Sequence, residues 1–358
     1  MRNSRIEVSD PFGVASDPEM PTLASALDPV EAQTEFSRLK GLSAGVHRTV
    51  RLQEIRVTRY KPHRRCMIEY VIAFEGPDTA FETFTLIGKV RARRFGKSGY
   101  QLLSRIQQAG FGIDSEDGIS VPEPQGTISK FQMWLQRKVP GQVATDLLSA
   151  PDGVELVRRI AEASHKLHKA GVPAERRHTM SDELEILRKC LLTVAREEPA
   201  LAGRILRLLE ACVRLGRATP APTLCGIHRD FYADQLIVDG PRLYLIDFDL
   251  YCEGDAGLDV GNFVGHITEQ SLRTFGDSRA LADLERAMEE RFVELAGAGT
   301  RAAVRSYAAL TLARHIYLST LFPTRRPFTR NLLELCEERL DIAGHPSART
   351  PIPAAFSR

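Results

Sequence analysis

The sequence predicts an α+β fold with two lobes, a small antiparallel β-sheet lobe followed by a mainly helical lobe. Three observations support this prediction. Residues 50–95 alternate between apolar and polar side chains in three runs, as the strands of a half-buried sheet do. Val139-Pro140-Gly141 then has the composition of a hinge. Beyond the hinge, apolar side chains recur at helical spacing almost everywhere except in residues 224–247.

The first lobe is predicted over residues 45–138. Its expected elements are three antiparallel strands, a helix and a further strand pair, at 52–60, 66–74, 80–90, 99–106, 118–121 and 131–135. Residues 1–44 are interpreted as a flexible lead-in with a docking helix, because Pro, Ser and Asp are frequent and Asp28 can cap a helix from Pro29 to Leu42.

The second lobe is predicted over residues 139–345, and a flexible tail over 346–358, where Pro346, Pro351 and Pro353 occur. Its later helices are expected at 279–297, 301–321 and 327–343. His165 and His168 lie three residues apart on its first helix. No third metal ligand is spaced to join them, so we interpret both as packing or surface residues.

Composition favours a cytoplasmic protein. The chain has 358 residues, enough to bury a substantial core, and a formal net charge of +2. Aromatic residues make up only 7% and the basic residues are scattered, which argues against nucleic acid as a partner. Six cysteines without a CxxC pair are typical of reduced thiols. No apolar stretch is long enough to span a bilayer, so neither secretion nor membrane insertion is expected.

The segment 225–259 carries the chemistry. His228-Arg229-Asp230 is followed by Gln235, and two apolar runs then flank the turn Asp239-Gly240-Pro241 before Asp247-Phe248-Asp249. A hairpin with this turn should bring Asp247 close to Gln235 and Asp230. Phosphoryl transfer from a nucleotide needs a carboxylate at the attacking hydroxyl and oxygen ligands for magnesium. The sequence therefore predicts a magnesium-dependent phosphotransfer site.

This segment resembles the HxDxxxxN motif, short hairpin and acidic DxD element of the aminoglycoside phosphotransferase and choline kinase-like family, whose fold is protein kinase-like. Residues 254–259, GDAGLD, are similar to the GDPxxDL signature of that family, and residues 59–62 and 86–90 resemble its first strands. The resemblance covers residues 45–340. It implies a kinase that transfers the γ-phosphoryl group of ATP to a hydroxyl of a small-molecule acceptor, with ATP and Mg²⁺ as cofactors.

The resemblance also implies a role for each matching residue. Asp230 would be the catalytic base, and Asp247 would be the main magnesium ligand, with Gln235 as the second. Lys89 would contact the α- and β-phosphates. The backbone of residues 134–136, ending at Gln136, would bond the adenine.

Further residues would support this site. His228 would be structural, with Asp259 as a partner that holds its ring. Arg64, in the basic turn 61–65, would cover the phosphates by its charge, and Asp249 would be an additional contact for metal or acceptor. Arg229 could bridge to Asp234 or Asp255.

Three departures from the family pattern keep an alternative open. Gln235 stands where the family has Asn, the helix over 99–106 offers no Glu to pair with Lys89, and the turn 61–65 has no glycine. A nucleotide-binding protein with weak or no catalysis is the alternative function. A protein kinase is disfavoured, because the few residues between Asp249 and Gly254 leave no room for an activation loop.

The acceptor stays open between an aminoglycoside, an amino alcohol, a sugar and a biosynthetic intermediate. Residues 1–140 contain 20 basic residues (Lys and Arg) and 16 acidic residues (Asp and Glu). Since the whole chain has 48 basic and 46 acidic residues, residues 141–358 contain 28 basic and 30 acidic ones. A mildly basic first lobe suits a nucleotide, and a mildly acidic second lobe suits metal and a cationic acceptor. Glu253, Asp255 and Glu269 are candidates for acidic groups near that acceptor.

Overall fold

The computed structural model describes residues 6–39, 42, 49–75, 82–92 and 98–342. The chain divides into two compact units. The first consists of Met1–Gly141 and Asp239–Asp249, and the second of Gln142–Val238 and Leu250–Arg358. The predicted tail at 346–358 and the first two residues of the strand predicted at 80–90 lie outside the described residues.

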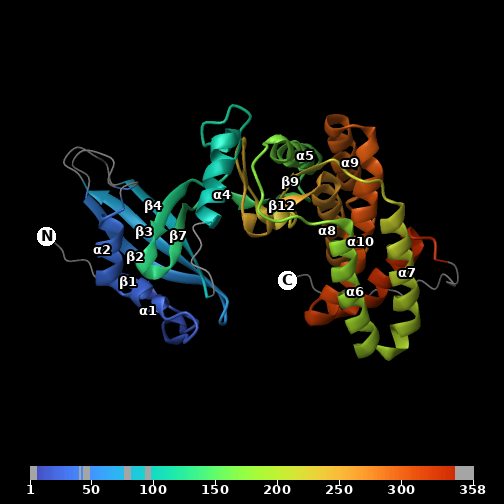
Figure 1. The fold of residues 1–358 in the computed structure, drawn as a ribbon, viewed down its shortest axis with the longest axis horizontal. Coiled ribbons are helices and arrows are strands. Elements are labelled where there is room, and N and C mark those ends of the chain that lie inside the picture. Colours follow the sequence, from blue (N-terminus) through green and yellow to red (C-terminus); the bar gives the residue numbers. More distant parts are fainter. Residues whose placement is uncertain (1–5, 40–41, 43–48, 76–81, 93–97, 343–358) are drawn as a thin grey trace. The chain divides into compact units, whose positions relative to one another are not determined.

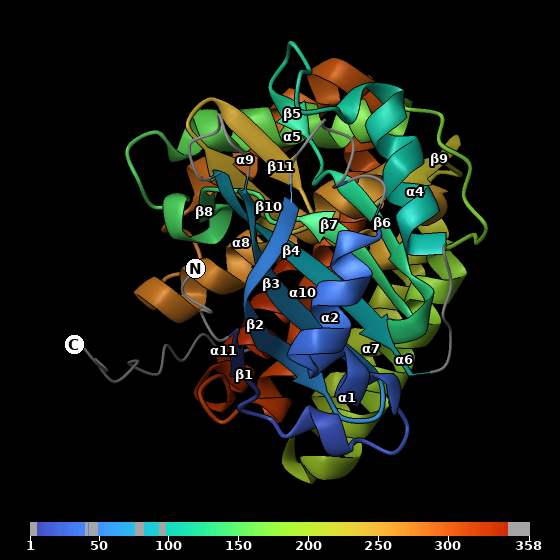
Figure 2. The same ribbon diagram turned by 90° about the vertical axis from the view of Figure 1, so that its left-hand side faces the viewer.

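The first unit is built on a six-stranded sheet with the order β1-β2-β3-β4-β7-β6 (Figures 1 and 2). The strands are β1 (Glu7–Ser9), β2 (Thr49–Lys61), β3 (Arg65–Glu75), β4 (Glu82–Arg91), β6 (Pro124–Ile128) and β7 (Met133–Arg137). β1 pairs in parallel with β2, and the other neighbours pair antiparallel. The three antiparallel strands predicted from residues 50–95 are thereby confirmed.

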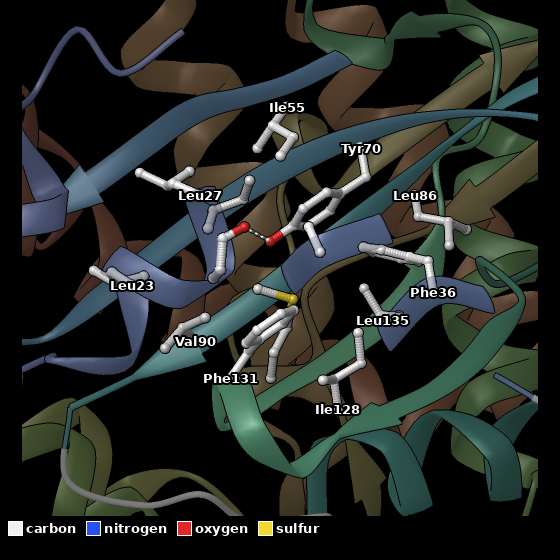
Figure 3. Close-up of a cluster of buried hydrophobic side chains, with 14 of the residues drawn as sticks. Leu23, Leu27, Phe36, Ile55, Tyr70, Leu86, Val90, Ile128, Phe131 and Leu135 are labelled. Atoms are coloured by element: carbon white, nitrogen blue, oxygen red, sulfur yellow. Dashed lines mark hydrogen bonds between the residues drawn. The ribbon is translucent and has the colours of Figure 1, made fainter. Parts of the chain in front are cut away.

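The N-terminal segment is part of the core of this unit. The helices α1 (Thr22–Leu27) and α2 (Pro29–Ser37) bury Leu23 and Phe36 against the sheet. The Tyr70 hydroxyl of β3 donates a 3.0 Å hydrogen bond to the carbonyl of Ala26 (Figure 3). Asp28 caps α2 as predicted, by accepting from two backbone N–H groups. The docking helix predicted from Pro29 is α2, whereas the interpretation of the preceding residues as flexible is wrong for residues 6–27, since their apolar side chains complete the hydrophobic core.

The strand pair predicted at 118–121 and 131–135 is also wrong. β5 (Ile119–Ser120) pairs in parallel with β11 (Arg242–Leu245), whereas β7 lies between β4 and β6. The missed strand β6 contains Pro124 and Gly126, which weaken the strand signal in the sequence. The predicted helix at 99–106 is confirmed as α4 (Ser98–Ile106).

The second unit is mainly helical, as predicted. Its helices are α5 (Gly153–Lys169), α6 (Met180–Glu197), α7 (Ala202–Ala218), α8 (Ala256–Phe275), α9 (Ala282–Ala296), α10 (Arg301–Leu321) and α11 (Thr329–Arg339). Its short strands are β8 (Gln142–Val143), β9 (Leu224–Ile227), β10 (Leu236–Asp239) and β12 (Cys252–Asp255). β9 pairs antiparallel with β12, and β10 with β8.

Glycines let α8 lie directly against α10. Gly257, Gly261 and Gly265 recur every fourth residue on one face of α8. A Cβ atom at Gly261 would lie 2.6 Å from the Tyr307 Cβ of α10, and one at Gly265 would lie 2.8 Å from the Thr311 Cβ. Only glycine fits at this distance, so the two backbones are in close contact.

All six cysteines are free thiols, and four of them are buried, as expected for small core residues. Among the described residues, no helix combines the length and the apolar composition that crossing a bilayer requires.

Candidate active site

A buried carboxylate holds the start of the predicted catalytic loop. Asp259, in the first turn of α8, accepts hydrogen bonds from the backbone N–H groups of His228, at 2.8 Å, and Arg229, at 2.6 Å. The same carboxylate lies 2.9 Å from Nε2 of His168 on α5. His228 and Arg229 belong to the loop, whereas His168 lies 91 positions before Asp259 in the sequence. Asp259 therefore fixes the loop between two helices of the second unit.

Two sequence interpretations can be compared with the structure here. Asp259 accepts a hydrogen bond from the main chain of His228, while its contact with the His228 ring stays a prediction. His168, interpreted as a packing or surface residue, is buried and packs edge to face on the Phe292 ring, and its bond to Asp259 is a contact that the sequence did not predict. The sequence did not indicate that His168 bonds to Asp259, because the two residues are 91 positions apart.

The backbone of the loop is strained beside Asp230. Arg229 has φ of 70°, a left-handed conformation that costs a bulky side chain on the order of 1–3 kcal/mol. The bond from its N–H to Asp259 holds it there. On the other side, the Asn262 side chain of α8 donates a 3.0 Å hydrogen bond to the Phe231 carbonyl. Asp230 is thus presented, partly exposed, from a loop that α8 clamps at both ends.

Gln235 ends a short 3-10 turn directly before β10 and is largely buried. Its backbone N–H donates to the Tyr232 carbonyl at 2.9 Å. The neighbouring Asp234 accepts a hydrogen bond from the Thr145 hydroxyl, and Asp255 caps α8 by accepting from the Gly257 N–H at 2.8 Å. Both carboxylates that were candidates to bridge with Arg229 therefore have structural partners of their own.

In the first unit, Lys89 of β4 lies beside Asp247. Its Nζ is 3.8 Å from Oδ1 of Asp247 and 5.0 Å from the centroid of the Trp134 ring of β7. The sequence has no Glu in α4 that could pair with Lys89. The carboxylate next to Lys89 is Asp247, the predicted magnesium ligand. Asp247 has φ of 62°, so a second predicted site residue adopts the left-handed conformation.

Asp249 forms ion pairs with two arginines that the sequence analysis did not single out. Its Oδ2 contacts Nη2 of Arg91 and lies 3.6 Å from Nη1 of Arg65. Arg65 of β3 and Arg91 of β4 are directly opposite in the sheet, where like charges repel unless an anion lies between them. Burial favours a higher pKa for the Asp249 carboxyl, but Lys89 and Arg91 outweigh it and lower the pKa. The sequence signal that could have identified Arg91 is its position two residues after Lys89, which places both side chains on the same face of the strand.

The basic turn after β2 is held by a buried aspartate. His63 has φ of 57° where a turn would favour glycine, and its Nδ1 lies 3.0 Å from Oδ1 of Asp17. Asp17 also accepts from the Tyr60 hydroxyl at 2.8 Å. Burial favours a higher pKa for Asp17, but the hydrogen bonds from Tyr60 and His63 lower it to about 2. Arg64 is exposed on this anchored turn.

The remaining predicted residue, Gln136, is buried in β7 opposite Ile87 of β4. Lys89, Arg64, Gln136, Asp247 and Asp249 belong to the first unit, and Asp230, Gln235, His228 and Asp259 to the second. The structure brings Lys89 to Asp247 and Asp259 to the His228 segment. The approach of Asp230 and Gln235 to Asp247 stays a prediction.

An antiparallel sheet unit joined to a helical unit is the protein kinase-like α+β fold, and solved structures of small-molecule kinases share it. A choline/ethanolamine kinase family protein from Mesorhizobium loti has 14% identity and a TM-score of 0.52, covering 88% of this chain and 95% of its own. A spectinomycin phosphotransferase solved with ADP and spectinomycin has 11% identity and a TM-score of 0.51, covering 87% and 94%. An aminoglycoside phosphotransferase solved with AMP-PNP and hygromycin B has 15% identity and a TM-score of 0.52, covering 82% and 95%.

The chain belongs to the phosphotransferase enzyme family, whose model matches residues 100–296, more than half of the chain. No curated protein matches it. The family and the fold class predicted from the segment 225–259 and from the order of strands and helices are thereby confirmed. At identities of 11–15%, the solved structures show the fold alone.

Proposed function

We propose that this protein is a small-molecule kinase that transfers the γ-phosphoryl group of ATP to a hydroxyl of a small-molecule acceptor. The observation that carries the proposal is the contact between Lys89 and Asp247. A lysine on an interior strand of the sheet and a carboxylate at the end of β11 are the two groups that a nucleotide phosphate chain and its cation require together.

Catalysis would rest on positioning and charge. Asp230 would accept the proton of the acceptor hydroxyl while its oxygen attacks the γ-phosphorus; the bond from that phosphorus to the β,γ-bridging oxygen breaks, and ADP leaves. Lys89, together with Arg65 and Arg91 behind it, would neutralise the phosphate oxygens. The backbone near Gln136 would bond the adenine, and Arg64 would cover the phosphates.

The donor groups fit Mg²⁺. Asp247 and Gln235 offer a carboxylate and an amide oxygen, which are the hard ligands that magnesium prefers. These two residues would hold the ion, and the ion would neutralise charge on the β- and γ-phosphates. Asp249, the additional candidate from the sequence, is instead paired with Arg65 and Arg91. Two relatives of the same fold were solved with ADP and with AMP-PNP, which supports ATP as the donor.

Release of ADP tests the proposal. The purified protein is incubated with Mg²⁺, ATP and a panel of hydroxylated metabolites and antibiotics, and one or more acceptors should stimulate ADP release. Asp230→Asn should abolish transfer while the thermal shift caused by Mg²⁺-ATP persists. Equal loss of transfer and nucleotide binding would instead assign Asp230 a role in folding.

A second candidate function is nucleotide binding with weak or no catalysis, which the replacement of the family Asn by Gln235 favours. It predicts a thermal shift with Mg²⁺-ATP but no stimulated ADP release with any acceptor. Gln235→Asn separates the two. In an active kinase adapted to Gln, shortening the side chain should raise the magnesium concentration needed for half-maximal rate, because magnesium tolerates displaced ligands poorly. In an inactive protein, the same change should restore turnover.

A further inference from the structure

One face of α8 follows the catalytic loop residue by residue. Asp259 bonds to the backbone of Arg229, Asn262 bonds to the carbonyl of Phe231, and His266 stacks on Tyr232. The rings of Tyr232 and His266 are nearly parallel, at 16°, with centroids 4.4 Å apart. The spacing of three and four residues places these α8 side chains on the same side of the helix. The loop that carries Asp230 therefore leads directly to a stacked pair of rings.

A second histidine extends this pair into the interior of the unit. The His315 ring of α10 meets the His266 ring edge to face, with centroids 4.5 Å apart. His315 is only 1% exposed, and neither of its ring nitrogens has a hydrogen-bond partner among the described residues. Buried polar groups are rarely left in this state, because each costs about 1–3 kcal/mol. A ring with two unsatisfied nitrogens beside the catalytic loop suggests a ligand that supplies both bonds.

The charges around the three rings favour a ligand without positive charge. Arg314 bonds to Glu183 at 2.9 Å and to the Asn262 side-chain oxygen at 2.8 Å. Glu269 bonds to Arg273 at 3.1 Å and lies 3.9 Å from Arg325. Three guanidinium groups thus accompany two carboxylates, and both carboxylates are already paired. Glu269, which the sequence offered as an acidic group for a cationic acceptor, is engaged by arginine.

The imidazoles themselves stay uncharged in this setting. Burial is the largest cause that lowers the pKa of His266 and of His315, and Arg314 and Arg325 add to it. A neutral imidazole has one nitrogen that donates and one that accepts. A hydroxyl group also donates and accepts, so a compound with several hydroxyls can satisfy both nitrogens, whereas an ammonium group can only donate.

We propose that Tyr232, His266 and His315 form a subsite for the acceptor, and that the acceptor is a polyhydroxylated compound without positive charge, of the sugar or cyclitol type. The stacked rings would lie against the apolar face of the acceptor, and His315 would bond its hydroxyls. The inference rests on the proposed kinase function and narrows its substrate class. It disfavours the aminoglycoside and amino alcohol acceptors that the family resemblance left open.

Two panels of compounds test the substrate class. One contains uncharged sugars, cyclitols and sugar acids, and the other contains aminoglycosides, choline and ethanolamine. Stimulated ADP release should occur with members of the first panel and stay at the basal rate with the second. A clear preference for cationic acceptors would overturn the inference.

Variants test the residues. His315→Phe and His266→Phe keep a ring but remove its nitrogens, and each should raise the KM for the best polyol by about tenfold, the effect of losing one or two hydrogen bonds. The KM for ATP should not change. His165→Phe is the matched control, because this histidine of the same unit packs against the Phe292 ring. An unchanged acceptor KM in both folded variants would contradict the subsite.

Direct binding separates this inference from the kinase function. Calorimetric titration of the wild-type protein with the polyol panel, without nucleotide, should detect saturable binding that His315→Phe weakens. Such binding without any turnover would sustain the subsite while the proposed phosphotransfer fails. If no polyol of the panel binds and none is phosphorylated, the subsite is refuted.

Discussion

Asp259 and His168 lie 2.9 Å apart in the interior of the second unit, and the carboxylate of this pair also accepts hydrogen bonds from the backbone of the predicted catalytic loop. One side chain therefore ties α5, α8 and residues 228–229 together. Both members of the pair are buried, Asp259 completely, and burial strengthens their hydrogen bonds.

We expect Asp259→Asn to lower both stability and activity. The amide keeps the size of the side chain but loses the charge, and one of its two polar atoms cannot accept the bonds that the carboxylate accepts. The free energy of unfolding should fall by about 2–4 kcal/mol, in the range for a damaged buried network. Urea unfolding measures the free energy of unfolding of Asp259→Asn. The control is Asp283→Asn, which changes an exposed carboxylate of the same unit. A loss below 0.5 kcal/mol (roughly the effect of a surface change) would show that the network is dispensable.

Lys89→Met should impair nucleotide use and leave stability nearly unchanged. The methionine keeps the apolar stem over Trp134 but removes the charge next to Asp247. We expect kcat/KM for ATP to fall by about 100-fold or more, since electrostatic stabilisation of phosphate is lost. The control is Lys138→Met, which breaks the 2.7 Å ion pair with Glu69 in the same unit. Equal effects of the two variants would mean that Lys89 has no special role.

Asp249→Asn should destabilise the first unit without changing the magnesium requirement. The carboxylate lies between Arg65 and Arg91, and its removal leaves two guanidinium groups facing each other on paired strands. A loss of about 1 kcal/mol is expected from partly exposed charges. The experiment is thermal unfolding together with a magnesium titration of the rate. A marked rise in the magnesium concentration for half-maximal rate would instead make Asp249 a metal ligand.

Acid should destabilise the second unit through its buried histidines. The pKa of His315 is lowered from 6.5 to about 3, first by burial and then by Arg314, Arg325 and Arg273. Below pH 6.5 the unfolded state binds a proton at this histidine that the folded state excludes. The contribution of His315 to the free energy of unfolding is therefore fully present above pH 6.5 and is lost as the pH falls below that value. For one such group, the free energy of unfolding should drop by about 2 kcal/mol between pH 7 and pH 5.

Urea unfolding at several pH values checks this dependence. In His315→Phe the decrease in the free energy of unfolding between pH 7 and pH 5 should be smaller by about 2 kcal/mol, because the titrating imidazole is gone. The difference between wild type and variant cancels the contributions of other titrating groups, such as His266 and Asp255. The same slope in the variant and the wild type would indicate that His315 is protonated in the folded protein.

The family and the order of elements could be predicted because they rest on local patterns. The alternation in β2, β3 and β4 and the apolar stripes of α9, α10 and α11 each lie within one segment. The segment 225–259 carries its motif residues at fixed spacings, so the resemblance needed no tertiary information.

The features that sequence reasoning missed are mainly contacts between residues that are distant in the sequence. The pairing of β5 with β11 joins residues more than 120 positions apart, and the contact of His168 with Asp259 spans 91. The buried helix α1 was mistaken for part of a lead-in because it is short and flanked by Pro and Asp, although Leu23, Ala26 and Leu27 have helical spacing. The paired arginines at Asp249 follow from strand register, which composition does not reveal.

The glycines of α8 have a consequence for how the specificity of this protein could change. Two helices whose main chains touch at three successive turns cannot slide past each other without a collision, so His315 of α10 keeps its place relative to Asp259 and His266 of α8. In the proposed subsite, substitutions at positions 232, 266 and 315 would then alter which acceptor binds without displacing the carboxylate that anchors the loop. New substrate preferences would arise on an unchanged reaction centre.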